Sequence, residues 1–252
     1  MKTIQVELGL RSYQVHVKSG LIEKIPVLLS KNNHGQKWVI ISQHGLLELF
    51  GFELISVLRR QHFNIDYVTL PMGEAAKSIK EFSSIISQLS ELGCDRSTTV
   101  LALGGGVVGD ISGFAASTFM RGIEYFHIPT TLLAMVDSSI GGKTGINIVA
   151  GKNMVGTFYQ PKGVFVDPNI LSSLPRTEVI AGLGEVIKYG AIKDADFLRE
   201  IYTWLNDIDS FPFEEAIRRC CEIKAGIISI DEQENDLRRI LNFGHTIGHA
   251  LE

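Results

Sequence analysis

Short apolar segments alternate with segments of helical pattern between residues 38 and 128, and few folds accommodate that order. The apolar segments are rich in Val, Ile and Leu, as strands of a sheet covered on both faces must be. Alternation at this spacing is typical of βαβ units on a parallel sheet. The predicted strands are 38–41, 65–70, 98–103 and 124–128, and the predicted helices are 45–61, 77–92 and 107–119.

The two ends of the chain follow other patterns. Residues 2–8 and 13–17 predict two strands joined by a turn at Gly9. After about residue 165 we expect no further strand, and helical patterns cover 176–191, 195–206 and 212–229. We therefore predict an α/β fold, with a Rossmann-like nucleotide-binding domain and its parallel sheet at 1–166, and the beginning of a mainly α-helical domain at 167–252.

Composition excludes several classes of protein. A chain of 252 residues with 45% hydrophobic and 21% charged residues is ordinary for a soluble globular protein. A net charge of −4 without a long basic run argues against nucleic acid as a partner. No segment approaches the ~18 apolar residues of a membrane helix, and no signal peptide is recognisable. Cys94, Cys220 and Cys221 have no Cys-x-x-Cys spacing, which favours a reducing cytoplasm.

A glycine-rich loop follows the predicted strand 98–103. Gly104, Gly106 and Gly109 satisfy G-x-G-x-x-G directly before a predicted helix, a context in which backbone N–H groups hold a pyrophosphate. The alternative is a tight turn without a ligand, and the strand–turn–helix context favours a nucleotide. Glu74 and Lys77 lie in a second strand-to-helix loop, which the residues alone indicate to be an ordinary helix N-terminus.

Two lysines lie in glycine-rich segments farther along the chain. Gly142, Lys143 and Thr144 suggest a P-loop, but that motif requires glycine at position 137, where Asp137 stands. Lys143 and Lys152 then remain as a possible phosphate-binding surface on loops, with ordinary solvated lysines as the alternative.

The C-terminal half contains further candidates. Glu185 and Lys188 are three apart on a predicted helix, where they form either a surface ion pair or, through Glu185, an oxygen ligand for zinc. Lys224 and Arg238 flank an acidic segment that has the character of a charged helix end and loop. His245 and His249 are four apart, so that on a helix both rings face one metal or one anionic substrate.

Taken together and in order, the motifs from about residue 36 onward resemble the 3-dehydroquinate synthase family. The segments that carry the resemblance are 104–110, 121–122, 129–139, 141–145, 151–153 and 242–250. It implies a lyase of the shikimate pathway that uses NAD and zinc or cobalt and acts as a cytoplasmic homodimer. Such enzymes convert 3-deoxy-D-arabino-heptulosonate 7-phosphate into 3-dehydroquinate and phosphate. The reaction combines transient oxidation, phosphate elimination, re-reduction and intramolecular aldol closure.

The resemblance also implies a role for each matching residue. The domain at 1–166 would bind NAD, through Glu74, Lys77, Gly104, Gly105, Gly106, Asp110, Thr130 and Thr131. The helical domain would bind metal through Glu185 and His245 and the substrate carboxylate through Lys224 and Arg238. The substrate phosphate would contact Lys143, Lys152, Asn153, Asn242 and His249, with Arg121 reaching across from the dimer mate. Asp137 and Lys188 would position the ring hydroxyls, and the catalytic set is His249, Lys143, Asp137, Lys188 and Asn242.

The sequence departs from the family pattern in three places. It ends before the histidine that serves as third metal ligand, so we expect an incomplete zinc site and weak or absent activity. Thr177 stands where arginine is usual, and Ser42 and Gln43 stand where an acid or amide meets the adenosine ribose. Alternative functions are another sugar-phosphate cyclase, a polyol dehydrogenase that releases NADH, or an inactive NAD-binding fragment.

Overall fold

The computed structural model describes residues 2–244, and the predicted site residues His245 and His249 lie outside this range. One seven-stranded sheet has the order β1-β2-β9-β6-β5-β3-β4. Its strands are β1 (Lys2–Val6), β2 (Tyr13–Val17), β3 (Lys37–Gln43), β4 (Asn64–Leu70), β5 (Thr99–Gly104), β6 (Glu124–Pro129) and β9 (Gly163–Val166). The β1–β2 pair is antiparallel and the other pairings are parallel, as the βαβ pattern predicts.

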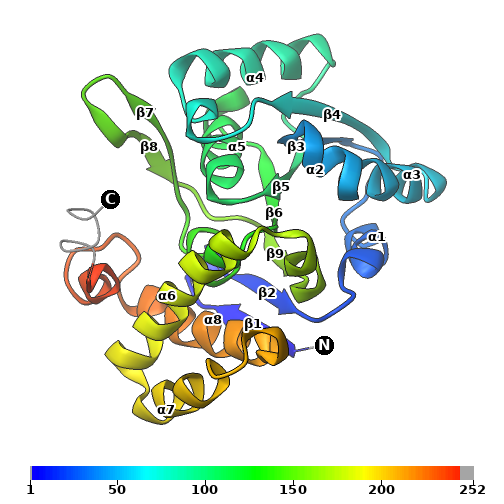
Figure 1. Ribbon diagram of the computed structural model, residues 1–252. Helices are drawn as coiled ribbons and strands as arrows, with labels where there is room; N and C mark the ends of the chain where they lie inside the picture. The colour runs from blue at the N-terminus through cyan, green and yellow to red at the C-terminus, as the bar shows by residue number, and fades with distance from the viewer. Residues whose placement is uncertain (1, 245–252) are drawn as a thin grey trace.

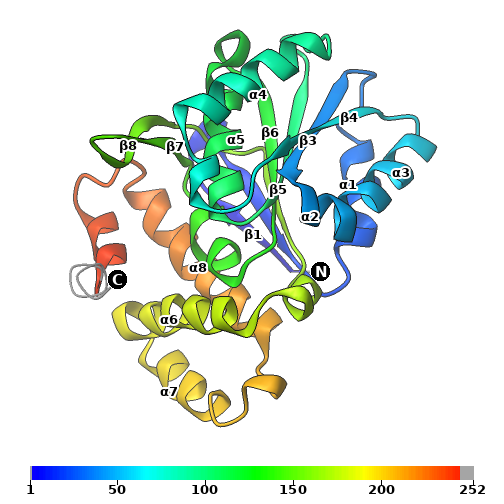
Figure 2. The same ribbon diagram turned by 45° about the horizontal axis from the view of Figure 1, so that its top comes forward.

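Helices cover both faces of this sheet (Figures 1 and 2). On one face α4 (Ile79–Glu91) and α5 (Gly106–Thr118) pack against Val39 and Ile41 of β3. On the other face α1 (Ile25–Ser30) and α3 (Phe52–Arg60) pack against Trp38 and Ile40, and the short helix α2 (His44–Leu46) follows β3 directly. Consecutive residues of β3 thus enter different cores, because side chains of a strand alternate between its faces.

The predicted helices differ from the observed ones mainly at their ends. The segment expected as one helix at 45–61 consists of α2, a π-helical turn at Leu47–Gly51 and α3 in immediate succession. The helix expected from residue 77 begins at Ile79 because Ser78 caps it, its side chain accepting the Glu81 N–H at 3.4 Å.

The two lysine-bearing segments are strands, so the expectation of loops was wrong. β7 (Lys143–Ile148) and β8 (Gly151–Phe158) form an antiparallel hairpin that extends from the body of the molecule (Figure 1). The hairpin is glycine-rich because its two backbones approach closely, and a Cβ on Gly156 would lie 2.0 Å from the Thr144 carbonyl oxygen. Most of β8 is exposed, so the apolar alternation that marks a half-buried strand is missing from its sequence.

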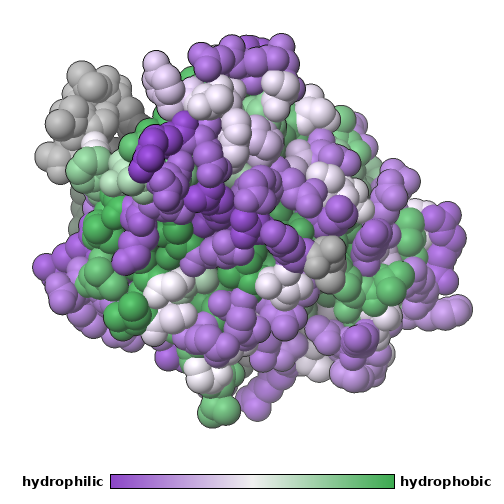
Figure 3. All heavy atoms as spheres, turned by 90° about the horizontal axis from the view of Figure 1, so that it is seen from below, coloured by the Kyte–Doolittle hydropathy of each residue, from purple (hydrophilic) through white to green (hydrophobic). Residues whose placement is uncertain are grey.

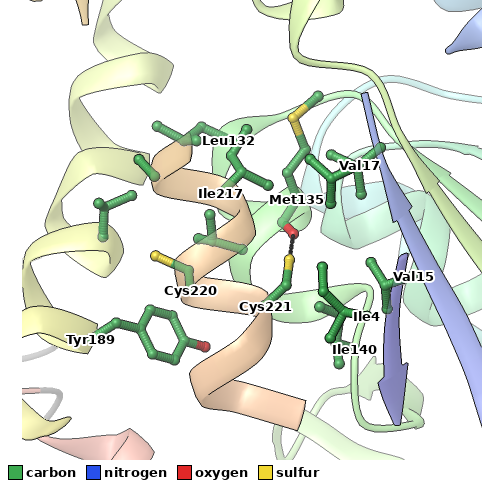
Figure 4. Packing of buried hydrophobic residues seen from close by; sticks show 14 of the residues in the cluster. Ile4, Val15, Val17, Leu132, Met135, Ile140, Tyr189, Ile217, Cys220 and Cys221 are labelled. Atoms are coloured by element: carbon green, nitrogen blue, oxygen red, sulfur yellow. Dashed lines mark hydrogen bonds between the residues drawn. The ribbon is translucent and has the colours of Figure 1, made fainter. Parts of the chain in front are cut away.

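The helical half matches the predicted pattern, and no strand follows Val166 within residues 2–244. Its helices are α6 (Arg176–Lys193), α7 (Ala195–Trp204) and α8 (Phe213–Ile230), with short 3-10 segments η7 (Pro168–Ser173), η8 (Ile208–Ser210) and η9 (Leu237–Asn242). The N-terminal hairpin shares its core, since Ile4 and Val17 belong to one buried cluster with Ile217 and Cys221 (Figure 4). Cys94, Cys220 and Cys221 are all free and buried.

The surface is mixed in character. The face seen in Figure 3 carries hydrophilic and hydrophobic side chains side by side. Among the residues that the structure describes, no helix combines the length and the apolar character that crossing a membrane requires.

Candidate active site

The glycine-rich loop has the geometry that its spacing predicts. β5 ends at Gly104 and α5 begins at Gly106, so the first N–H groups of α5 point out of the loop. A Cβ on Gly105 would lie 3.0 Å from the Thr131 side chain, and one on Gly106 would lie 3.0 Å from the Ser138 hydroxyl. The hydroxyl of Ser138 is buried without a hydrogen-bond partner in the described structure. The two glycines therefore let Thr131 and Ser138 pack closely against the loop, and the unpartnered Ser138 hydroxyl lies beside the N-terminal N–H groups of α5.

The threonines expected at this loop lie next to it. The Thr130 N–H donates to the Gly104 carbonyl at 3.1 Å, and the Thr131 hydroxyl accepts the Ala134 N–H at 3.1 Å. The third glycine of the motif serves packing instead. A Cβ on Gly109 would lie 2.1 Å from the His127 ring, so only glycine lets α5 lie this close to β6.

Asp110, Lys77 and Asn153 form a small polar cluster beside the loop. Lys77 is 5% exposed and donates to Asp110 Oδ2 at 2.5 Å and also to Asn153 Oδ1. Burial raises the pKa of Asp110 to about 6, and the Lys77 ammonium only partly opposes that rise. Glu74 joins the same network, because its carboxylate accepts from Asn147 at 2.6 Å and Asn147 accepts the Asn153 N–H at 2.8 Å. The cluster thus links residues expected to bind NAD with one expected to bind substrate.

Asp137 is the centre of a second cluster, built from three elements. It lies in the π-helical turn η6 (Ala134–Ser138), and its Oδ1 accepts from Lys224 of α8 at 2.6 Å and from Tyr189 of α6 at 3.0 Å. Lys224 also donates to the Asp137 carbonyl at 2.6 Å. Burial alone would raise the pKa of Asp137, but Lys224, Lys188 and Tyr189 together hold it well below its usual value. Asp137 is therefore ionised at neutral pH, and its contacts with Lys224 and Tyr189 hold the carboxylate in one orientation.

Glu185 and Lys188 are paired, as one of the two interpretations expected, but the pair is not on the surface. The Lys188 ammonium contacts Glu185 Oε2, and the two side chains are 6% and 16% exposed. Within residues 2–244 no group of three His, Cys, Asp or Glu side chains is arranged to hold a metal ion. Glu185 is thus a buried carboxylate of the right ligand type, and its expected partner His245 lies outside the described residues.

Arg238 is buried, in contrast to the charged loop that the residues alone suggested. It is 2% exposed and donates to the Gly141 carbonyl at 3.1 Å and to the Glu232 carbonyl. The N-terminal hairpin supports both partners, because Tyr13 accepts the Gly141 N–H at 3.0 Å and Arg11 pairs with the Glu232 carboxylate at 2.7 Å. The position of Arg238 thus depends on residues at the far end of the sequence.

A cavity of about 640 Å³ brings seven of the predicted site residues together. They are Asp110, Asp137, Lys143, Asn153, Lys224, Arg238 and Asn242. Thr144, Gly145 and Phe158 of the hairpin complete one wall, and the Arg238 guanidinium lies 5.9 Å from the Phe158 ring centre. A space lined by three cations, two carboxylates and two amides suits a small, polar, multiply charged ligand better than an apolar one.

Among the described residues expected to contact the substrate phosphate, two lie away from this cavity, and Glu185 and Lys188 do not line it either. Lys152 is exposed on β8, and Arg121 is exposed at the end of the 3-10 turn Phe119–Arg121. Neither lines the cavity wall. Ser42, the expected substitute at the adenosine ribose, is buried and donates to the Leu103 carbonyl at 2.6 Å.

Sequence reasoning missed Tyr189 and Glu234. The Tyr189 hydroxyl fixes Asp137, and Glu234 pairs with Lys143 and accepts from Asn242 at 2.8 Å. Tyr189 follows Lys188 directly, but adjacent residues of a helix do not face the same way, so this position gave no signal. Glu234 belongs to an acidic segment that resembles an ordinary solvated loop, and no local pattern distinguishes it.

Comparisons with known proteins agree with one another. Residues 67–181 match the 3-dehydroquinate synthase N-terminal family and residues 182–252 match the C-terminal family. The 3-dehydroquinate synthase of Thermodesulfovibrio yellowstonii is 48% identical over the whole chain, which spans 71% of that protein.

Solved structures of related cyclases have the same fold. A 2-deoxy-scyllo-inosose synthase complexed with carbaglucose-6-phosphate, NAD+ and Co2+ superposes with a TM-score of 0.89 at 28% identity, covering 99% of this chain and 70% of that one. A 2-epi-5-epi-valiolone synthase from Streptomyces hygroscopicus with NAD+ and Zn2+ bound gives 0.84 at 28% identity, covering 98% and 68%.

Proposed function

The chain belongs to the 3-dehydroquinate synthase family, and we propose that its cavity converts 3-deoxy-D-arabino-heptulosonate 7-phosphate into 3-dehydroquinate and phosphate. The observation that carries the proposal is the convergence of Lys224 and Arg238 with Lys143 on one cavity. Such a substrate has a carboxylate and a phosphate, and three cations that line the same cavity can bind both groups at once. We propose a cytoplasmic homodimer in which the partner subunit's Arg121 completes the phosphate site.

NAD fits the nucleotide loop. The strand–turn–helix geometry of the loop and the unpartnered Ser138 hydroxyl beside the N-terminus of α5 support a bound pyrophosphate there. When bound, NAD accepts a hydride and later returns it, so that the substrate is oxidised only transiently. Residues 1–166 would supply this NAD site, with Glu74, Lys77, Asp110, Thr130 and Thr131 around it.

A divalent zinc or cobalt ion is the second cofactor that we propose, with residues 167–252 supplying its ligands. When bound, such an ion polarises a substrate oxygen. Glu185 is the ligand that the described residues contribute, and Lys188 now balances its charge. His245 would be the second ligand.

The side chains of the cavity divide the remaining work. Lys224 and Tyr189 hold Asp137 through Oδ1, which leaves Oδ2 to accept a hydrogen bond from a substrate hydroxyl. Lys143 and Asn242 would neutralise the charge that develops on the departing phosphate. The walls around these groups keep the two ends of the opened sugar close together for ring closure.

The test is to supply the chain with 3-deoxy-D-arabino-heptulosonate 7-phosphate, NAD and zinc or cobalt and to follow phosphate and NADH together. We expect that any phosphate release, even a weak one, occurs without net NADH. NADH that accumulates without phosphate release would instead indicate a polyol dehydrogenase. Equal turnover of a sugar phosphate that lacks the carboxylate would favour another cyclase, because Lys224 and Arg238 would then have no anion to bind.

A further inference from the structure

Glu234 lies between two groups that the proposed function assigns to the substrate phosphate. Its Oε2 pairs with the Lys143 ammonium, and its Oε1 accepts from the Asn242 amide at 2.8 Å. Lys143 comes from the hairpin strand β7 and Asn242 from the end of η9, and both line the cavity. One carboxylate thus connects two separate elements at the place where an anion is expected.

Glu234 carries a negative charge and therefore resembles an anionic ligand of Lys143 and Asn242. Burial acts to raise its pKa, but the hydrogen bonds from Lys143 and Asn242 and the charge of Lys143 hold the pKa below its usual value. Glu234 is therefore ionised at neutral pH. Carboxylate and phosphate oxygens accept from the same ammonium and amide donors, so the two anions compete for them.

The loop that carries Glu234 is fastened on both sides of it. The Asp231 carboxylate accepts the N–H groups of Asn235, Asp236 and Arg238 at 2.9, 2.8 and 3.0 Å. Glu234 itself has a φ of 62°, a conformation that residues with a side chain rarely adopt. Because the backbone is fixed by other contacts, the carboxylate can leave Lys143 and Asn242 by rotation of its side chain alone.

We propose that Glu234 occupies the phosphate position of the ligand-free cavity, keeps Lys143 and Asn242 in place for the substrate, and is displaced by the substrate phosphate. The inference rests on the proposed function, which places phosphate at these two residues. The binding free energy of an incoming anion is therefore only the difference between the free energy of its own contacts with Lys143 and Asn242 and that of the Glu234 contacts it displaces. Return of the Glu234 carboxylate to Lys143 and Asn242 after elimination promotes release of the phosphate product.

The test is calorimetric titration of inorganic phosphate into the wild-type chain and the variant Glu234→Gln. Glutamine keeps the shape and an acceptor for Asn242 but removes the competing charge, so we expect the Kd for phosphate to fall about fivefold. Glu124→Gln is the matched control, with the same change at a distant ion pair. The Glu124 carboxylate lies 3.1 Å from the Lys162 ammonium and neither residue lines the cavity, so this variant should bind phosphate as the wild type does.

A third variant, Lys143→Ala, separates the inference from the proposed function. We expect it to lose most phosphate binding. If Lys143→Ala loses binding while Glu234→Gln binds no more tightly than the wild type, the inference about Glu234 is overturned and the phosphate site stands. If Lys143→Ala binds phosphate like the wild type, the phosphate site of the proposed function is wrong, and the inference fails with it.

Discussion

Two partly buried carboxylates of this molecule contact lysines at nearly the same distance and yet differ in pKa. Asp110 Oδ2 lies 2.5 Å from Lys77, and Asp137 Oδ1 lies 2.6 Å from Lys224. Burial raises the pKa of Asp110 to about 6, whereas the pKa of Asp137 is held well below its usual value although burial opposes this. The contact distance therefore does not decide the ionisation of either group.

The number of compensating groups explains the difference. Asp137 has the ammonium groups of Lys224 and Lys188 and the hydroxyl of Tyr189 around it. Asp110 has Lys77, which Asn153 shares, and the negative charges of Glu74 and Asp137 raise its pKa further. The carboxylate at Asp137 is thus held in its charged form, while the carboxylate at Asp110 can take up a proton near pH 6.

The largest effect is expected from Lys224→Met, which removes the main partner of Asp137. It leaves a partly buried carboxylate without its closest compensation, and we expect the free energy of unfolding to fall by about 3 kcal/mol. Urea denaturation at pH 7 measures it. Lys37→Met is the control, because the Lys37–Asp66 pair at 2.7 Å is more exposed and should cost at most about 1 kcal/mol. Equal losses in both variants would contradict the special position of Asp137.

A second effect concerns pH and the Asp110→Asn variant. Because the folded state raises the pKa of Asp110, its protonated form stabilises the fold below pH 4, and this contribution is lost as the pH rises through about 6. The wild type should therefore lose about 2–3 kcal/mol relative to Asp110→Asn between pH 4 and pH 6.5. Urea denaturation across that range measures it.

The control for this pH series is Asp95→Asn. Hydrogen bonds from Ser97 lower the pKa of exposed Asp95, so its contribution is present above the unfolded pKa and is lost as the pH falls. The difference in the free energy of unfolding between the wild type and Asp110→Asn and that between the wild type and Asp95→Asn should therefore change with pH in opposite directions. A difference for Asp110→Asn that does not vary with pH would show that Lys77 compensates Asp110 fully.

The smallest effect is expected from Tyr189→Phe, which removes one hydrogen bond to Asp137 and keeps the ring. We expect a stability loss of about 1–2 kcal/mol together with a lower kcat, since Asp137 loses one of the two groups that orient it. Tyr125→Phe removes a comparable buried hydrogen bond, to the Tyr159 carbonyl at 2.9 Å. It should lower stability without lowering kcat. If both variants reduce kcat equally, Tyr189 has no particular role at Asp137.

The sequence predicted those parts of the site that depend on local spacing. Gly104, Gly106 and Gly109 lie between a strand and a helix, and their roles follow from neighbours close in the chain. Lys143 lines the cavity, and its role at an anion site stays a prediction; its segment was mistaken for a loop because the glycines of the hairpin hide the strand pattern.

The parts that could not be predicted depend on distant contacts. Glu234 meets Lys143 across 91 positions, and Tyr189 meets Asp137 across 52, so neither role leaves a local pattern. The division at residue 166 remains a prediction for the same reason. The N-terminal hairpin pairs through β2 with β9 of the sheet, and the apolar side chains on one of its faces pack against the helical half. The sequence of residues 2–17 alone does not indicate either contact.

The links between the N-terminal hairpin and Arg238 bear on how the molecule folds. Arg11 and Glu232 are 221 positions apart, and Tyr13 and Gly141 are 128 apart. Contacts between residues so far apart in the sequence form slowly, because the entropy cost of closing a large loop precedes the free energy gained from the contact. We therefore expect the part of the cavity around Arg238 to be among the last to assemble during refolding. Substitutions at Arg11 or Tyr13 should then change the rate at which the binding site forms as well as its final shape.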